Sequence, residues 1–289
     1  MLAAPEGRSV PSERPGGTDM LPLPRTYLFV PGDRPERFAK AFASGADAVV
    51  LDLEDAVAPP AKAAARAAVA AALAGDAARL VVRINDRSSA CFGDDLALLA
   101  AARATAVMLP KAESQGDIDV VRAVCPGIAL LALVESARGV LACDALAAAQ
   151  GVRRLVFGSI DFALDLGLDG ELATTTGLDH AMSRIALASR AAGIAPPVAG
   201  VTTALDDEAL LLADLSRARA HGFAAKLCIH PKQIAPVHAA LAPSAEELLW
   251  AERVLAAAAQ AGGAAVQLDG RMVDKPVIER ARRLQSRSR

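Results

Sequence analysis

Two carboxylates, Glu135 and Asp161, are the residues whose type and setting point most directly to chemistry. Each follows an apolar run typical of a β-strand, IALLALV before Glu135 and RRLVFGSI before Asp161. Neighbouring parallel strands end at the same edge of a sheet, so we expect the two side chains to lie close together. Mg²⁺ is commonly held by one or two carboxylates, with water and substrate oxygens in its other positions. The pair therefore predicts a Mg²⁺ site. The alternative is that each acid only stabilises the start of the helix that follows it.

Polar side chains also follow most of the other apolar runs. In a barrel of parallel strands the carboxyl ends carry the active site, so this repeated placement argues for one convergent site. A slight excess of acids over bases at these ends suits a metal ion together with an anionic substrate. The residues are Asp33, Arg34, Asp52, Glu54, Asp55, Arg83, Asn85, Lys111, Glu113 and His230.

Arg83 is the basic residue of this set that is best suited to bind substrate. Its planar guanidinium can hold a carboxylate or an enolate oxygen through parallel hydrogen bonds. The alternative is a structural ion pair with Asp52, Glu54 or Asp55. These three acids can also hold Arg83 and metal-bound water in place.

Lys111, His230 and one glycine–serine pair each admit two interpretations. Lys111 can bind a substrate anion or pair with Glu113. His230 can act as a general base, although a hydrogen-bonded histidine in the core is favoured. Gly158 and Ser159 can present backbone N–H groups to a substrate carboxylate at a helix start, or they can simply form a tight turn.

Eight apolar, β-rich runs alternate with helix-like runs between residues 25 and 242. Short runs that are apolar throughout are typical of parallel strands buried on both faces. The alternation predicts an α/β fold, a (β/α)8 TIM barrel. A doubly wound open sheet is the alternative, but no G-x-G-x-x-G follows the first strand, which disfavours dinucleotide binding. The strand runs are TYLFV, DAVVLDLED, RLVVRIN, AVMLPKAE, IALLALVES, RLVFGSIDF, PPVAGVT and AAKLCIHP.

The segments on either side of the barrel differ from it in composition. Residues 1–24 are rich in proline, glycine and charge, and we expect a disordered tail, with order beginning at Arg25. Residues 243–289 form a C-terminal helical extension. It contains a helix over SAEELLWAERVLAAAAQ, a hairpin or strand with a DG turn, and a last helix from Pro276. In this setting Asp274 is interpreted as the N-cap of the last helix.

The composition describes a chain with a large apolar fraction and almost no net charge. Of 289 residues, 53% are hydrophobic and 22% are charged, and the formal net charge is -2. This excludes a basic field for nucleic acid or membrane, and aromatic residues at 3% are too few for base stacking. We find no apolar stretch long enough to span a membrane. Four scattered cysteines and no apolar leader predict reduced thiols and a cytoplasmic protein.

Eight motifs occur between Arg25 and about Val277. They are RTYLFVPGDRPERFAKA, VVLDLEDAV, VVRIN, LPKAE, LVESARGV, GSIDFALDLG, AAKLCIHPKQI and GRMVDKPV. In this order and taken together, they resemble the citrate lyase β-subunit-like proteins of the HpcH/HpaI aldolase superfamily. The segment after the seventh strand, GVTTALDDEALLLADLSRARAHG, is looser than in that family, and the tail before Arg25 has no counterpart.

The resemblance implies a (β/α)8 barrel with a C-terminal extension, assembled as a homo-oligomer, either a trimer or a hexamer. It implies Mg²⁺ as cofactor, with Glu135 and Asp161 as its ligands and Arg83 as the substrate-binding and catalytic arginine. Asp274 matches an aspartate that reaches a neighbour's active site in related lyases and acts as base there. The extension would then contribute to both the oligomer and the active site.

The implied function is that of a Mg²⁺-dependent acyl-CoA lyase. It would cleave a citramalyl-, malyl- or citryl-thioester into an acyl-CoA and a 2-oxo acid or oxaloacetate. Three alternatives stay open: a citrate lyase β subunit acting on a citryl acyl carrier protein, an aldolase of free 2-oxo acids, and a non-catalytic protein on the same barrel. The presence of Arg83, Glu135, Asp161 and Asp274 together argues against the last.

Overall fold

The computed structural model describes residues 23–75, 77–169, 171–260 and 265–286, without the side chains of residues 171–175. Most of the tail predicted for residues 1–24 therefore lies outside the described residues. At the end of that stretch, the carbonyl oxygen of Pro24 accepts a hydrogen bond of 2.6 Å from Arg154 Nη1. The chain is thus already fixed to the fold one residue before Arg25.

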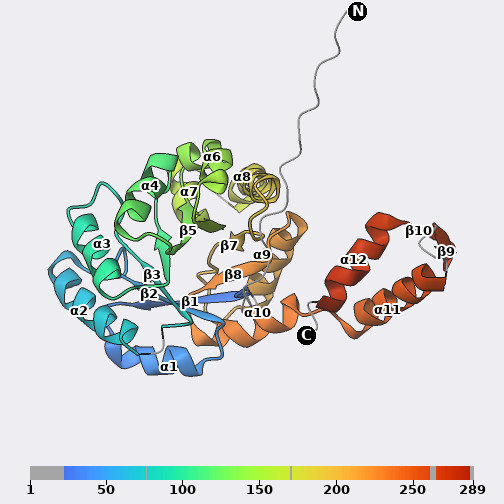
Figure 1. The fold of residues 1–289 in the computed structure, drawn as a ribbon, viewed down its shortest axis with the longest axis horizontal. Helices are drawn as coiled ribbons and strands as arrows, with labels where there is room; N and C mark the ends of the chain where they lie inside the picture. Colours follow the sequence, from blue (N-terminus) through green and yellow to red (C-terminus); the bar gives the residue numbers. More distant parts are fainter. Residues whose placement is uncertain (1–22, 76, 170, 261–264, 287–289) are drawn as a thin grey trace, which may run out of the picture.

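Eight parallel strands among the described residues close into a barrel (Figure 1). Each strand pairs with the next along the chain, and β1 pairs with β8. The predicted barrel is confirmed, and the open-sheet alternative is wrong. The strands are β1 (Thr26–Pro31), β2 (Ala48–Asp52), β3 (Leu80–Arg83), β4 (Ala106–Leu109), β5 (Ala129–Val134), β6 (Val152–Phe157), β7 (Val198–Ala199) and β8 (Ala225–Cys228).

Helices follow the strands and cover the outside of the barrel (Figure 1). The alanine-rich α2 is typical, because alanine is the best helix former and its larger side chains, Val69 and Leu73, recur on the buried face one turn apart. The barrel helices are α1 (Phe38–Ala43), α2 (Lys62–Leu73), α3 (Phe92–Ala101), α4 (Gln115–Val124), α5 (Ala137–Leu141), α6 (Cys143–Ala148), α7 (Ser159–Asp165), α8 (Glu171–Ala191), α9 (Glu208–Ala220) and α10 (Ile234–Leu241), with 3-10 turns at Pro35–Arg37, Pro59–Ala61 and Pro231–Gln233.

The barrel interior is filled by side chains. Alternate residues of each strand face inward, and the others pack under the helices. Arg154 lies among the inward-facing residues of β6, with its guanidinium over the ring of Tyr27, and donates 2.5 Å to the carbonyl oxygen of Pro196. In barrels of this kind, the active site lies at the C-terminal ends of the strands. The buried inner layer includes Val50, Val81, Met108, Leu131, Leu133, Val156 and Leu227.

The four cysteines are free, and Cys125, Cys143 and Cys228 are buried. Burial raises the pKa of Cys143 and that of Cys228 to about 12, so these two thiols are unreactive at neutral pH.

Within the described parts of the chain, no helix combines the length and the apolar character that a membrane crossing requires.

The C-terminal extension forms an arm that stands beside the barrel (Figure 1). It consists of α11 (Ala245–Gln260), an antiparallel hairpin of β9 (Val266–Leu268) and β10 (Arg271–Val273), and α12 (Lys275–Ser286). The turn residues Asp269 and Gly270 have φ values of 52° and 75°, the left-handed pair that a two-residue hairpin turn requires. The predicted helix, DG turn and last helix are therefore all present. A small core of the arm's own joins its helices through Ala251, Val254, Val273, Ala281 and Leu284.

Candidate active site

The C-terminal ends of neighbouring strands bring the predicted polar residues to one rim of the barrel. Asp52 ends β2, Arg83 ends β3, and the two residues are direct partners in the strand register. Glu135 follows β5 directly, and Asp161 lies in the first turn of α7, just after β6. The topology therefore places these residues on four strand ends of the same rim, β2, β3, β5 and β6.

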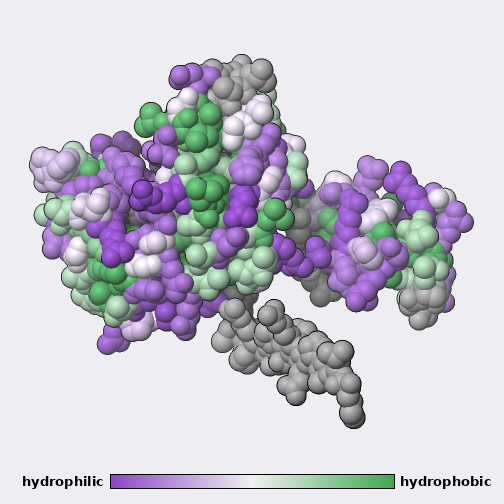
Figure 2. Space-filling view, turned by 90° about the horizontal axis from the view of Figure 1, so that it is seen from above, coloured by the Kyte–Doolittle hydropathy of each residue, from purple (hydrophilic) through white to green (hydrophobic). Residues whose placement is uncertain are grey.

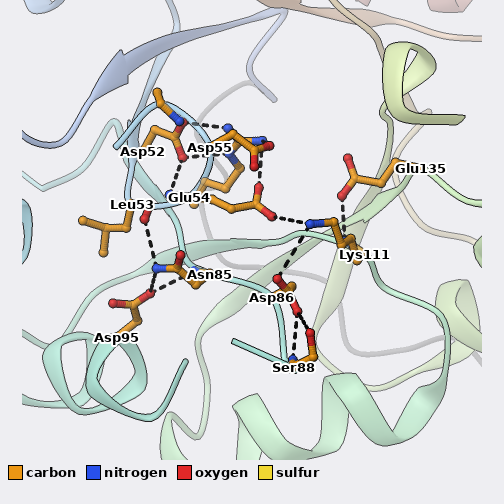
Figure 3. A network of polar contacts seen from close by, with 12 residues as sticks. Asp52, Leu53, Glu54, Asp55, Asn85, Asp86, Ser88, Asp95, Lys111 and Glu135 are labelled. Atoms are coloured by element: carbon orange, nitrogen blue, oxygen red, sulfur yellow. Dashed lines mark hydrogen bonds and ion pairs between the residues drawn. The ribbon is translucent and has the colours of Figure 1, made fainter. Parts of the chain in front are cut away.

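Arg83 is held by three acids at the end of β2 and just after it, Asp52, Glu54 and Asp55, which are labelled in Figure 3. Its Nε and Nη2 donate to the two oxygens of Asp52 at 2.8 and 2.6 Å. Its Nη1 lies 3.0 Å from Glu54 Oε2 and 3.6 Å from Asp55 Oδ2. Burial alone would lower the pKa of Arg83, but the bonds to Asp52 and the charges of the other two acids outweigh it and raise the pKa. The alternative interpretation of Arg83, an ion pair with one of these acids, is therefore met by all three, and they fix a permanent cation at the rim.

Lys111 extends this network toward β5. Its Nζ lies 3.3 Å from Glu54 Oε1 and 3.7 Å from Asp86 Oδ2. The predicted pairing of Lys111 with Glu113 is wrong, because Glu113 instead accepts a bond of 2.7 Å from Ser136 Oγ. Glu54 thus stands between two cations, Arg83 on one side and Lys111 on the other.

Glu135 is buried, with 4% of the residue exposed, and its carboxylate is seated by two neighbours. The backbone N–H of Lys111 donates to Glu135 Oε1 at 2.8 Å, and Lys111 adopts a left-handed φ of 47°. A β-carbon added to Gly158 would lie only 2.6 Å from Glu135 Oε2. Any larger residue at position 158 would therefore force the Glu135 side chain to move.

The carboxylates at the rim repel one another. Burial is the main reason why the pKa of Glu135 rises from its ordinary value of 4.5 to about 8. The charges of Glu54 and Asp161 raise it further, whereas the Lys111 N–H and the charge of Arg83 lower it. The pKa of Glu54 also rises, mainly through burial, to about 7. A divalent cation bound between Glu135 and Asp161 would relieve this repulsion.

The donors fit a hard cation such as Mg²⁺. Both are carboxylates, Glu135 being buried and Asp161 exposed at the rim. Across the described residues, no three His, Cys, Asp or Glu side chains gather into a complete metal cage. Mg²⁺ does not require one, because it usually keeps one or two carboxylates and fills its shell with water and substrate. The assignment of Glu135 and Asp161 as metal ligands stays a prediction that this chemistry supports.

Gly158 and Ser159 have a packing role that the sequence does not reveal. Gly158 makes room for Glu135, as described above, and Ser159 opens α7. A β-carbon added to Gly200, after β7, would collide with Ser159 Oγ, so this hydroxyl lies against the neighbouring strand end. Substrate binding by Gly158 and Ser159 stays a prediction.

Asp274 lies on the arm and not at the rim. Its Oδ1 accepts a hydrogen bond of 3.3 Å from Val277 N, so it caps α12 as the local sequence pattern predicts. Figure 1 shows β10 and the start of α12 at the end of the arm farthest from the barrel. Within one chain, Asp274 therefore does not meet Arg83.

A cavity of about 390 Å³ opens beside the rim, between β1, α1 and the end of β8. Arg37, Lys40 and His230 contribute its polar lining. His230 is only partly buried, and its Nδ1 accepts a hydrogen bond of 3.2 Å from Lys232 N. The favoured interpretation of His230 as a core histidine is therefore wrong. We did not predict Arg37 and Lys40 as site residues, because Arg37 lies in a 3-10 turn and Lys40 in α1, and neither is at a strand end.

Comparison with known proteins agrees with this architecture. The model of the HpcH/HpaI aldolase/citrate lyase family matches residues 25–231, and that of C–C bond lyases of the TIM-barrel fold matches residues 184–289. The chain is 42% identical over 261 residues to a citrate lyase subunit beta-like protein of Mycobacterium tuberculosis, covering 88% of this chain and 92% of that protein. It is 35% identical over 268 residues to a (3S)-malyl-CoA thioesterase of Cereibacter sphaeroides, covering 89% and 92%.

A solved structure is similar over nearly the whole chain. It is that of CitE from Mycobacterium tuberculosis in complex with magnesium, acetoacetate and coenzyme A. The TM-score is 0.81 at 39% identity, with 91% of this chain and 97% of that chain covered. Sequence motifs, barrel and relatives agree, and the chain belongs to the HpcH/HpaI aldolase/citrate lyase family.

Proposed function

We propose that the protein is a Mg²⁺-dependent carbon–carbon lyase of CoA esters. It would cleave a citramalyl-, malyl- or citryl-thioester into an acyl-CoA and a 2-oxo acid or oxaloacetate. One observation carries the proposal: a buried carboxylate with a raised pKa, Glu135, shares a rim with Asp161 and with the immobilised cation Arg83. A similar solved structure, that of CitE from Mycobacterium tuberculosis, holds magnesium, acetoacetate and coenzyme A. This supports Mg²⁺ as the cofactor and a CoA ester as the substrate.

The rim residues divide the chemistry between them. Held by Glu135 and Asp161, Mg²⁺ supplies a Lewis acid and a template for the part of the substrate that leaves as the oxo acid. Arg83 uses Nε and one N–H of Nη2 for Asp52, and its Nη1 faces Glu54. This leaves the second N–H of each terminal nitrogen for substrate. Fixed charge aimed at an oxygen that becomes negative is usually the largest catalytic contribution.

Proton transfer would come from Asp274 of a second copy. The base takes the proton of the substrate hydroxyl, the C–C bond breaks, and the hydroxyl carbon becomes the carbonyl of the oxo acid. The electron pair of the broken bond passes into the thioester as an enolate beside Arg83. The proton then returns to the enolate carbon, which gives the acyl-CoA. Asp274 lies on the part of the arm that is farthest from its own barrel. This position is compatible with Asp274 entering the active site of a neighbouring copy.

The cavity beside β1 is our proposed place for the coenzyme. Arg37 and Lys40 lie on its wall, and apolar residues of β1 and the β8 loop, including Leu28, Val30 and Ile229, complete the lining. A basic pair beside an apolar wall matches a ligand that carries phosphates on an apolar stem. The thioester would extend from this cavity to the rim.

Assembly into a homo-oligomer, a trimer or a hexamer, follows from the same proposal. Two leucines on the outer helices of the barrel are strongly exposed, Leu141 of α5 at 79% and Leu164 of α7 at 80%. The two helices are neighbours, because Ala137 N donates to Asp165 Oδ2 at 2.7 Å. Figure 2 looks onto the side of the molecule where Figure 1 labels α6, α7 and α8, and it shows apolar areas among polar ones. Exposed apolar surface of this kind is typical of interfaces.

We also propose that the protein is cytoplasmic. Free, buried thiols are compatible with this location.

Thioester hydrolysis is the second candidate, because one relative is a (3S)-malyl-CoA thioesterase. An assay that separates products decides between the two. The protein is incubated with Mg²⁺ and (S)-citramalyl-CoA or L-malyl-CoA, and 2-oxo acid, acyl-CoA and free thiol are measured. A lyase releases 2-oxo acid and acyl-CoA in equal amounts, whereas a thioesterase releases free thiol and no oxo acid. A citryl acyl carrier protein and a free 2-oxo acid, run in parallel, test the remaining alternatives.

A further inference from the structure

Lys62, the first residue of α2, has an ammonium group surrounded by neutral oxygens. Its Nζ donates to the carbonyl oxygens of Leu53 and Glu54, each at 2.6 Å, and to Asn85 Oδ1 at 2.7 Å. An ammonium has three N–H donors, and three acceptors lie within reach. The group is therefore saturated by the protein and holds three points of the structure together.

The amide of Asn85 is fixed in its turn by Asp95 of α3 (Figure 3). Asn85 Nδ2 donates to Asp95 Oδ2 at 2.6 Å and to the carbonyl oxygen of Leu53 at 2.9 Å. This arrangement leaves only Oδ1 to face Lys62, so one orientation of the amide satisfies every bond. Asn85 and Asp95 are buried, with 4% and 0% exposed. The point to which Lys62 is tied is therefore rigid.

The restraint acts on the backbone of Glu54. Lys62 holds the carbonyl oxygens on either side of the Glu54 α-carbon, and the N–H of Glu54 donates to Asp52 Oδ1 at 2.9 Å. With both flanking peptides fixed, the Glu54 carboxylate is directed to its place between Arg83 Nη1, at 3.0 Å, and Lys111 Nζ, at 3.3 Å.

We propose that Lys62 is a positioning residue of the active site. It acts through Glu54 on Arg83 and Lys111 and does not itself touch substrate. The inference rests on the proposed function, since it assigns Lys62 a role in the same reaction. Small displacements of catalytic groups slow a reaction strongly, since a misplacement of about 1 Å can lower the rate about 100-fold. A purely structural lysine would stabilise the fold without coupling to Glu54.

The test is a double-mutant cycle of Lys62→Met and Glu54→Gln with Arg79→Met as matched control. Arg79 also donates to two backbone carbonyl oxygens, those of Ala46 and Phe42 at 3.2 and 3.3 Å, but before β3, at the opposite end of the barrel. Turnover of the CoA ester, calorimetric affinity for Mg²⁺, affinity for pyruvate in the presence of Mg²⁺, and Tm are measured for each variant.

We expect Lys62→Met to lower kcat at least about tenfold per folded protein while Mg²⁺ affinity changes less than about twofold. Lys62→Met should lower kcat no further in the Glu54→Gln background, because Lys62 acts on turnover only by placing the Glu54 carboxylate, which that background already lacks. Arg79→Met should lower Tm and leave kcat unchanged. Multiplicative losses for Lys62 and Glu54, or a Lys62→Met protein with wild-type kcat, overturn the proposal.

Failure of the proposed function would look different. In that case the wild-type protein itself turns over none of the thioesters, while the cycle is still read from the affinity for pyruvate. Non-additive effects of Lys62→Met and Glu54→Gln on that affinity uphold the positioning role, and additive effects overturn it.

Discussion

Glu135 carries a conflict between stability and function that is typical of a metal ligand. Its carboxylate is buried, and it faces the charges of Glu54 and Asp161, so its pKa rises to about 8. A group whose pKa is raised on folding stabilises the fold in its protonated state, and this contribution is lost as pH rises through the folded pKa. The metal-free protein should therefore lose stability from mildly acidic pH up to about pH 8.

Glu135→Gln should separate the two roles. Glutamine keeps the acceptor for Lys111 N but carries no charge, so Tm of the metal-free variant should exceed that of wild type by a few degrees at a pH of about 9. The variant should also lose the rise in Tm that Mg²⁺ gives wild type. Thermal unfolding with and without Mg²⁺, across the pH range, measures both effects. A variant that Mg²⁺ still stabilises like wild type contradicts the assignment.

Asp274→Asn tests the proposed base. We expect kcat to fall at least about 100-fold, since asparagine cannot take a proton, with Mg²⁺ affinity unchanged. Asp269→Asn is the matched control, because Asp269 lies on the same hairpin and pairs with Arg253 at 2.5 Å. Loss of activity in both variants to the same degree would instead indicate a damaged arm.

At this scale the sequence predicts the members of the site better than their partners. Glu135, Asp161 and Arg83 are recognisable because each follows an apolar run. The partner of Lys111 is not, because its left-handed φ of 47° turns the chain toward Glu54 and away from the adjacent Glu113. Lys62 escapes attention because its role depends on two carbonyl oxygens, which no sequence pattern displays.

The strands and helices follow closely from the chain's composition. Short apolar runs predict all eight strands, since parallel strands buried on both faces leave no polar alternation. The β6–α7 connection contains a residue, Gly158, whose role local sequence patterns do not predict. Gly158 looks like a turn or an anion-binding residue from sequence. In the fold it is the contact surface for Glu135, which is 23 residues earlier in the chain.

Gly158→Ala should disturb this connection in a specific way. The added methyl carbon would lie 2.6 Å from the Glu135 carboxylate, so the side chain must move, and we expect Mg²⁺ affinity to fall at least about tenfold. Gly93→Ala serves as control, because a β-carbon there meets no atom within 4 Å. Calorimetric titration of Mg²⁺ into both variants decides, and equal affinities would show that Glu135 does not depend on position 158.

The whole molecule consists of a barrel with the rim residues and an arm with Asp274, which stands away from that rim (Figure 1). The sequence predicts the arm's helices and hairpin. Its direction relative to the barrel depends on tertiary packing, which local sequence patterns do not report. In the proposed function, a site shared between copies would bring Asp274 to the rim of a neighbouring barrel.

Mixing two inactive variants tests this arrangement. Glu135→Gln keeps an intact arm, and Asp274→Asn keeps an intact rim. Doubly purified mixed oligomers should regain about a quarter to a third of wild-type activity, because half of the rims are intact and about half to two thirds of those meet an intact arm. Co-expression with two affinity tags, followed by turnover of the doubly purified protein, measures the gain. Activity no higher than in either variant alone would mean that the site does not combine residues of two copies.

The measurement that tests the central claim most directly is the rate of 2-oxo acid release from (S)-citramalyl-CoA and L-malyl-CoA as Mg²⁺ is added to metal-stripped protein. The account predicts no release without metal, saturable release of oxo acid and acyl-CoA in equal amounts as Mg²⁺ rises, and no response in Asp161→Asn. Release that is unaffected by removal of the metal, or free thiol as the only product, would contradict it.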